Sequence, residues 1–163
     1  MTGMIMCVGA EKGGVGKSTI ATNVAVQLAT ADVDVVILDT DAQATCARFI
    51  ERRDAAGIEP RIPCVQRTGD VAATLRDIAN RYQIVIVDAG GRDSKELRTA
   101  LVASQLLITP TQASQADLET LPKVNELVSL AADSILTSKH TRFVSCALKP
   151  DDQGSGGCER VTG

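Results

Sequence analysis

The chain reads IMCVGAEKGGVGKSTI over residues 5–20, an apolar run followed by a glycine-rich loop and the first turn of a helix. This order of strand, loop and helix is the setting of a phosphate-binding loop. Because glycines lack a Cβ, backbone N–H groups can converge on phosphate oxygens, and the helix N-terminus adds unpaired donors. Lys17 can then reach the β- and γ-phosphates, and the Ser18 hydroxyl can ligate Mg²⁺. The residue types favour this interpretation over a glycine-rich turn with an incidental lysine.

Short apolar runs alternate along the chain with segments of helical periodicity. The runs are rich in Val and Ile without polar alternation, which is typical of parallel strands covered on both faces. The sequence therefore predicts an α/β fold, a doubly wound and mostly parallel sheet with helices on both faces. The expected strands are 5–8, 33–38, 62–65, 84–87, 106–108 and 142–148, and the expected helices are 18–30, 43–56, 70–82, one capped by Asp93 and one beginning near Thr120.

Two carboxylates, Asp39 and Asp41, follow the second expected strand. Ligands of doubly wound sheets bind at the carboxyl ends of the strands, so both side chains can point toward the phosphate loop. There they can support Mg²⁺ and position an attacking water. An alternative for Asp41 is an N-cap for the helix expected at 43–56, and both roles can hold together.

A third carboxylate, Asp88, directly follows the expected strand 84–87 and precedes Ala89 and two glycines. Four apolar residues and then an Asp is the Walker B arrangement, in which a carboxylate holds Mg²⁺, usually through water. Gly90 and Gly91 permit close approach of the backbone to the γ-phosphate and a loop that moves on hydrolysis. Because apolar strands often end in Asp, Asp88 is informative mainly together with the phosphate loop.

Length and composition narrow the class of protein. The chain has 163 residues, 44% hydrophobic and 23% charged, which predicts one globular domain at 1–150 and a flexible glycine-rich tail at 151–163. A net charge of −3 provides no global basic field for DNA or membranes, and 2% aromatic residues argue against base stacking. No apolar run is long enough to span a bilayer and no signal peptide is evident, so we expect a cytoplasmic protein.

The cysteines are widely spaced and form no CxxC pair. We therefore expect free thiols in a reducing compartment, with neither a disulfide framework nor a zinc site. Cys7 lies in an apolar run and is expected in the core. The five are Cys7, Cys46, Cys64, Cys146 and Cys158.

The segment KGGVGKS at residues 12–18 departs from the ordinary Walker A loop, because Glu11 stands where the first glycine belongs and Lys12 adds a second lysine. This is the deviant Walker A motif, and the sequence resembles the ParA/MinD family of ATPases, most of all the small plasmid-partition ParA proteins. The resemblance runs over about residues 5–148. It implies that Lys12 reaches the partner's phosphates in a nucleotide-sandwich dimer and stabilises transition-state charge in trans.

The resemblance also implies roles for single residues. Asp41 would orient the attacking water and Asp39 would support the metal, although Ala42 replaces the family's usual proline. Pro110 opens a segment like the one that lines the dimer interface near nucleotide. The implied catalytic residues are Lys12, Lys17 and Asp41; the implied nucleotide contacts are Lys12, Gly13, Gly14, Val15, Gly16, Lys17, Ser18, Thr19, Asp39, Asp88, Gly90, Gly91 and Pro110; the implied metal ligands are Ser18, Asp39 and Asp88.

These features lead to the hypothesis of an ATP- and Mg²⁺-dependent ATPase that dimerises on ATP binding and segregates plasmid or chromosomal DNA. The resemblance implies that the dimer binds nucleoid DNA nonspecifically and that a ParB-like, centromere-binding adaptor stimulates hydrolysis. No basic amphipathic helix is seen near the C-terminus, so membrane attachment is not expected. Basic residues that could contact DNA are Arg48, Arg52, Arg53, Lys139, Arg142 and Lys149.

Two other interpretations stay open. One is a nucleotide-binding scaffold or regulator of the same family that does not hydrolyse ATP, because the family pattern stops near Pro150. The other is a small-molecule ligase or kinase of the dethiobiotin synthetase type, for which no distinct insertion offers a substrate pocket. The pair Asp39 and Asp41, followed by Gln43, favours the partition ATPase.

Overall fold

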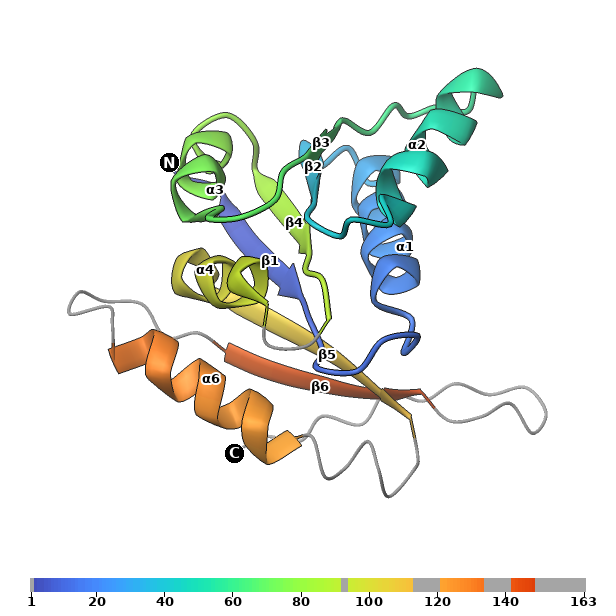
Figure 1. Cartoon of the computed structure of the whole chain (residues 1–163). Helices are drawn as coiled ribbons and strands as arrows, with labels where there is room; N and C mark the ends of the chain where they lie inside the picture. Colours follow the sequence, from blue (N-terminus) through green and yellow to red (C-terminus); the bar gives the residue numbers. More distant parts are fainter. Residues whose placement is uncertain (1, 92–93, 113–120, 134–141, 149–163) are drawn as a thin grey trace.

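The computed structural model describes residues 2–91, 94–112, 121–133 and 142–148. Its strands form one parallel sheet of six in the order β3-β2-β4-β1-β5-β6 (Figure 1). The predicted α/β class is confirmed. In chain order the elements are β1 (Met4–Val8), α1 (Lys17–Thr30), β2 (Val35–Asp39), α2 (Thr45–Ala55), β3 (Cys64–Gln66), α3 (Ala72–Ala79), β4 (Ile84–Asp88), α4 (Lys95–Ala103), β5 (Leu106–Gln112), α6 (Leu121–Asp133) and β6 (Arg142–Leu148).

Successive residues of the central strands face opposite sides of the sheet, and both sides are covered. In β1, Ile5 and Cys7 pack with residues of α3, α4 and α6, whereas Met6 and Val8 pack with α1 and α2. Continuous apolar runs arise because every residue of such a strand is buried. Cys7 is fully buried, as predicted, and burial raises the pKa of its thiol to about 12.

The register of the central strands brings their functional ends together. Asp39 at the end of β2 pairs with Asp88 at the end of β4, and Asp88 pairs with Val8 at the end of β1. The glycine-rich loop follows Val8 directly. Three segments that are distant in sequence therefore meet at one edge of the sheet, as the doubly wound topology predicts.

β5 is longer than predicted, because it continues past Ile108 through Pro110 to Gln112. β6 pairs with it along this whole length, from Leu106↔Arg142 to Gln112↔Leu148. The carbonyl oxygen of Ile108 faces β1 and accepts a hydrogen bond from the Gly9 N–H. Pro110, two residues later in β5, faces the same side, where β1 has already ended. The missing N–H of Pro110 therefore interrupts no hydrogen bond between β1 and β5.

Three helices begin later than the sequence indicates. The helix expected at 70–82 is the shorter α3, which spans only Ala72–Ala79. α2 starts at Thr45, because residues 41–44 form a turn that ends in a left-handed Ala44 (φ +49°). α4 starts at Lys95, and its N-cap is Ser94, whose hydroxyl accepts from the Leu97 N–H at 3.1 Å. The expected cap, Asp93, lies outside the described residues, and so does Thr120 before α6.

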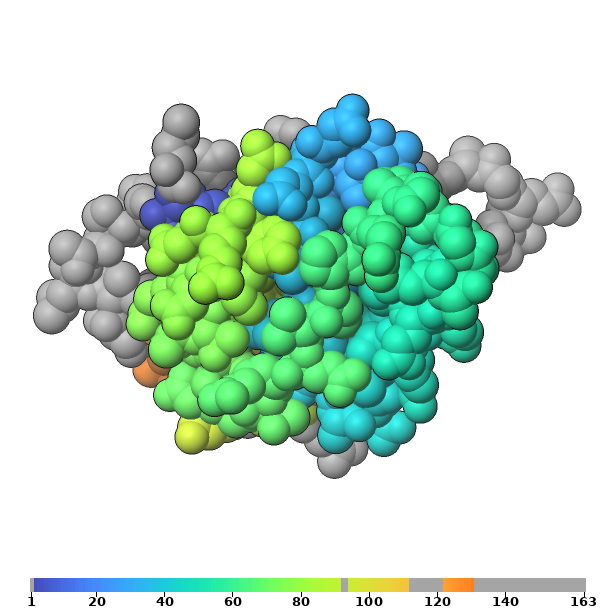
Figure 2. Space-filling model, turned by 90° about the horizontal axis from the view of Figure 1, so that it is seen from above, coloured from blue at the N-terminus to red at the C-terminus, as the bar shows by residue number. Residues whose placement is uncertain are grey.

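The connections around β3 cover one side of the molecule. Seen from above, the chain from α2 through β3 to α3 forms much of the visible surface (Figure 2). Over the described ranges, no helix is both long and apolar enough to cross a bilayer. The proposed tail at 151–163 lies outside those ranges and stays a prediction.

Candidate nucleotide-binding site

The glycine-rich loop between β1 and α1 has a backbone that suits glycine. Gly14 and Gly16 have φ angles of +76° and +90°, in the left-handed region that costs a residue with a Cβ roughly 1–2 kcal/mol. A Cβ on Gly13 or Gly14 would meet no heavy atom within 4 Å. Val15, only 4% exposed, anchors the loop. The loop therefore has both the conformation and the open side that a phosphate cradle needs.

The side chain of Lys17 is held beside this loop. It is 7% exposed, and Nζ donates to the Lys12 carbonyl oxygen at 3.3 Å. A Cβ on Gly91 would lie 3.6 Å from Nζ and 3.7 Å from the Glu11 carbonyl oxygen. The segment after β4 thus passes close to the loop, and Gly91 leaves the space beside the Lys17 ammonium open.

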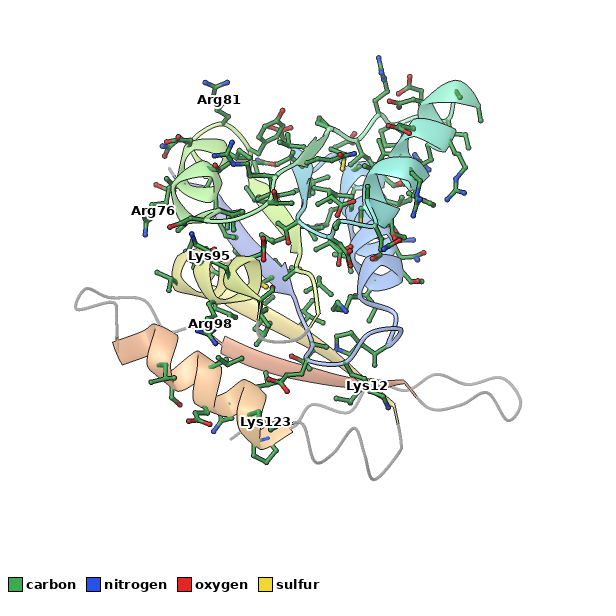
Figure 3. The ribbon with its side chains drawn as sticks, in the orientation of Figure 1. Lys12, Arg76, Arg81, Lys95, Arg98 and Lys123 are labelled. Carbon is green, nitrogen blue, oxygen red and sulfur yellow. The ribbon has the colours of Figure 1, made fainter. Side chains whose placement is uncertain are left out.

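The first turn of α1 and the start of the loop differ in exposure. Ser18 is half-buried, whereas Thr19 is exposed. Lys12 is exposed as well, and its side chain extends away from α1 (Figure 3). The two lysines of the motif therefore lie in different environments, Lys17 inside the site and Lys12 at the surface.

Asp39 is buried, and backbone N–H groups occupy both of its carboxylate oxygens. Oδ1 accepts from the Asp41 N–H at 3.1 Å, and Oδ2 accepts from the Ala47 N–H in the first turn of α2 at 3.0 Å. Asp41 is half-buried and accepts from the Gln43 N–H at 2.8 Å, an Asx turn. The alternative of Asp41 as the N-cap of α2 is therefore wrong, because Asp39 supplies the acceptor for that helix.

Asp88 is fully buried at the end of β4. Its Oδ2 accepts a hydrogen bond from the Cys46 thiol at 3.1 Å, whereas Oδ1 has no hydrogen-bond partner among the described residues. Burial raises the pKa of Asp88; the side chains of Ser18 and Cys46 and the charge of Lys17 lower it in part, and the charge of Asp39 raises it further. An unpartnered buried carboxylate oxygen is costly unless a cation or a donor reaches it.

Few acidic ligands surround this oxygen. Within the described ranges, no group of three or more His, Cys, Asp and Glu side chains could hold a metal ion. Mg²⁺, however, is commonly held by one or two carboxylates together with phosphate oxygens and water. The donor set of Asp88 and Ser18 beside an open phosphate cradle fits Mg²⁺ that arrives with a nucleotide.

Thr40 connects the two carboxylate-bearing segments, a role that sequence reasoning missed. Its Oγ1 donates to the Asp88 carbonyl oxygen at 2.9 Å, and its N–H donates to the same oxygen at 3.1 Å. The Gly90 N–H in turn donates to the Thr40 Oγ1 at 3.4 Å. Cys46 was likewise missed as a contact of Asp88. The sequence could have indicated Thr40, because it lies between two carboxylates, Asp39 and Asp41. No neighbouring motif indicated Cys46.

The remaining predicted residues are only partly described. Pro110 is buried in β5, and residues 113–117 after it lie outside the described ranges. Arg48 and Arg52 are exposed on α2, whereas the Arg53 guanidinium donates to the Pro60 carbonyl oxygen at 3.0 Å. The side chain of Arg142 and the residues Lys139 and Lys149 are not described.

A family model described as the CobQ/CobB/MinD/ParA nucleotide binding domain matches residues 6–136. The chain belongs to this family. The assignment agrees with the open glycine loop, the buried Lys17 and the carboxylates at the ends of β2 and β4, and it confirms the ParA/MinD resemblance.

Similar proteins are known in sequence and in structure. "Maintenance of carboxysome distribution protein A" from Gloeobacter kilaueensis is 35% identical over 113 residues, which are 68% of this chain and 50% of that protein. The match therefore spans about half the length of this relative. A plasmid partition protein from Borrelia burgdorferi B31 bound to AMPPNP has a TM-score of 0.76 at 15% identity, covering 94% of this chain and 79% of its own.

Two further structures share the fold. An ATP complex of Cyanothece McdA has a TM-score of 0.71 at 15% identity, with 91% of this chain and 70% of that chain covered. The MinD cell division protein of Aquifex aeolicus has a TM-score of 0.68 at 16% identity, with 88% and 68% covered. The fold is therefore shared with a plasmid partition protein and a cell division protein.

Proposed function

We propose that this protein binds ATP with Mg²⁺, dimerises in the ATP state and hydrolyses ATP slowly, as a switch that segregates plasmid or chromosomal DNA. The observation that carries the proposal is the fully buried Asp88 beside the buried Lys17, because the Oδ1 of Asp88 has no hydrogen-bond partner among the described residues. A carboxylate in this state gains most from a bound cation, and the open cradle of Gly13 and Gly14 leaves room for phosphates.

The residues of the chain divide the work as follows. Backbone N–H groups of the loop and Lys17 bind the phosphates, while Ser18 and Asp88 hold the metal and Asp39 supports it by fixing the turn at residues 41–44. Mg²⁺, when bound, neutralises charge on the phosphate oxygens. Asp41, presented by the turn that Asp39 fixes, orients the attacking water.

Lys12 acts across the dimer in this proposal. It is exposed at the surface, and its side chain extends away from α1 (Figure 3). A cation supplied in trans stabilises charge that develops in the transition state, as an arginine finger does. Pro110 and the segment after it would line the same interface.

The experiment is solution mass by light scattering for Asp41→Ala, which removes the water-orienting carboxylate, with Mg²⁺-ATP and with Mg²⁺-ADP. The proposal expects a monomer with ADP and a doubled mass with ATP, and the doubling should be lost in Lys12→Ala. An equal mass with ATP and with ADP contradicts the nucleotide-dependent switch. ATP binding without turnover in the wild-type protein would favour the non-hydrolysing scaffold.

Nonspecific DNA binding needs a basic face, and the structure offers two. Arg48 and Arg52 lie on α2. On the other side, the basic residues on α3, α4 and α6 are Arg76, Lys95, Arg98 and Lys123, and Arg81 lies in the loop after α3 (Figure 3). The two groups of helices cover opposite faces of the sheet. Alanine variants of each set therefore test which face binds DNA. The face that binds DNA should show a gel shift that weakens steeply with salt and disappears in its own variant.

A second function of the same switch is suggested by the relative at 35% identity, whose name assigns it to carboxysome distribution. The cargo would then be a protein assembly and the adaptor a protein bound to it, in place of a centromere-binding, ParB-like adaptor. Plasmid retention in cells that lack the protein discriminates the two. Unchanged retention together with mislocalised assemblies would favour the second function. For both functions, we propose that the protein lies in the cytoplasm, on the nucleoid.

A further inference from the structure

Cys46 is fully buried in the first turn of α2, against the side of the sheet that carries Met6, Val8 and Ile37. Its place is fixed by the next residue, Ala47, whose N–H donates to Asp39 at 3.0 Å. The thiol has two acceptors within reach, the Asp88 Oδ2 at 3.1 Å and the Ser18 carbonyl oxygen at 3.8 Å. Cys46 therefore contacts both residues that the proposed magnesium site uses.

One thiol proton can serve only one strong hydrogen bond at a time. The Asp88 Oδ2 lies closer to the thiol than the Ser18 carbonyl oxygen does, at 3.1 Å against 3.8 Å, so it is the preferred acceptor. Because Oδ2 is tied to Cys46, rotation of the carboxylate about its bond to Cβ is restricted. Among the described residues, Oδ1 has no hydrogen-bond partner. A ligating carboxylate is commonly oriented by such a partner behind it.

We propose that Cys46 is a positioning residue for the metal site: its thiol holds Asp88 Oδ2 so that Oδ1 stays available to Mg²⁺. This inference rests on the proposed function, since it needs Mg²⁺ to bind at Asp88. It predicts that metal affinity depends on the donor and not on the volume of residue 46.

The test uses the full chain and measures Mg²⁺ binding to the ADP complex by calorimetry. Cys46→Ala removes the donor, Cys46→Val removes it while filling the space, and Cys46→Ser keeps a donor. We expect Mg²⁺ affinity to fall about tenfold or more in the Ala and Val variants. The Ser variant should stay within about threefold of the wild type. ADP affinity without Mg²⁺ should change little in all three, because the hydrogen bonds of the thiol go to Asp88 and the Ser18 carbonyl oxygen and not to Lys17 or the loop glycines.

The matched control is Cys64→Ser, a half-buried thiol on β3 that is not hydrogen-bonded to Asp88 in the structure. Thermal unfolding of each variant verifies that it is folded. Equal Mg²⁺ affinity of wild type and Cys46→Ala, or an equal loss in the Ala and Ser variants, overturns the inference while leaving the proposed function standing. A wild-type protein whose ADP complex binds no Mg²⁺ overturns both.

Discussion

Asp39 and Ala47 are joined by a hydrogen bond of 3.0 Å, from the N–H of the third residue of α2 to a buried carboxylate at the end of β2. The first N–H groups of a helix have no partner inside the helix. Here a strand residue supplies the acceptor, because Ala44 at the N-cap position has no polar side chain. The second oxygen of Asp39 accepts from the Asp41 N–H, so one carboxylate fixes both the start of α2 and the turn that presents Asp41.

Replacement of Asp39 by Ala should therefore destabilise the fold. Two backbone N–H groups lose their acceptor, and we expect the free energy of unfolding to fall by about 1–3 kcal/mol. Chemical denaturation followed by circular dichroism measures the change. Asp77→Ala on the exposed side of α3 is the control and should stay within about 0.5 kcal/mol of wild type. An Asp39→Ala loss no larger than that of the control would contradict the capping role.

Thr40 provides a second connection, and its loss should loosen the segment after β4. Thr40→Val keeps the branched shape but removes the hydroxyl that bonds the Asp88 carbonyl oxygen and the Gly90 N–H. We expect about 1 kcal/mol of destabilisation and faster hydrogen exchange of the Gly90 amide, observed by NMR. Thr40→Ser retains the hydroxyl and should exchange like wild type. Unchanged Gly90 exchange in the Val variant would exclude the coupling.

The sheet was largely predictable because its strands are covered on both faces. Residues 5–8 and 84–87 are continuous apolar runs, and they match β1 and β4 closely. The end of β5 could not be predicted in this way. Pro110 has no N–H and its neighbours are threonines, so local preference favours a loop. The strand continues because β6 pairs alongside it, a long-range interaction that no local pattern records.

The site was predictable where its residues form local motifs and not where they meet through the fold. The glycine loop, Asp39 and Asp88 each follow a strand within a few residues. The contacts of Thr40 and Cys46 with Asp88 span 48 and 42 residues of sequence. They depend on the register that pairs Asp39 with Asp88, which becomes visible only in the assembled sheet.

Glu96 on α4 should make stability depend on pH. Its Oε1 accepts from the Gly69 N–H at 2.7 Å, and this hydrogen bond, above all, lowers the pKa of Glu96 from its usual 4.5. A carboxyl whose pKa is lowered by folding stabilises the protein above pH 4.5, and the contribution is lost as pH falls through the lowered folded value.

We therefore expect Glu96→Gln to be less stable than wild type at neutral pH, by less than about 1 kcal/mol because solvent still screens this half-buried group. The difference should shrink on acidification below pH 4.5. Denaturation midpoints over a pH series measure it, with Glu126→Gln on the exposed face of α6 as the control. A Glu96→Gln difference that stays constant down to low pH would show that the charge is not responsible.

The two glycines of the open loop separate a structural role from a binding role. Gly13 lacks a positive φ and a Cβ there meets no atom within 4 Å, whereas Gly14 has φ +76°. Gly13→Ala should keep the free energy of unfolding within about 0.5 kcal/mol of wild type, and Gly14→Ala should lower it by roughly 1 kcal/mol.

Unlike the free energy of unfolding, the affinity for ATP should fall in both variants. In both variants the new Cβ enters the space where phosphates approach the backbone, so affinity measured by calorimetry should fall at least about tenfold, or about 1.4 kcal/mol. A large loss of affinity in Gly13→Ala at unchanged stability can arise only if the open side of the loop holds the nucleotide. If Gly13→Ala instead binds ATP like wild type, the loop is an ordinary turn and the phosphates bind elsewhere.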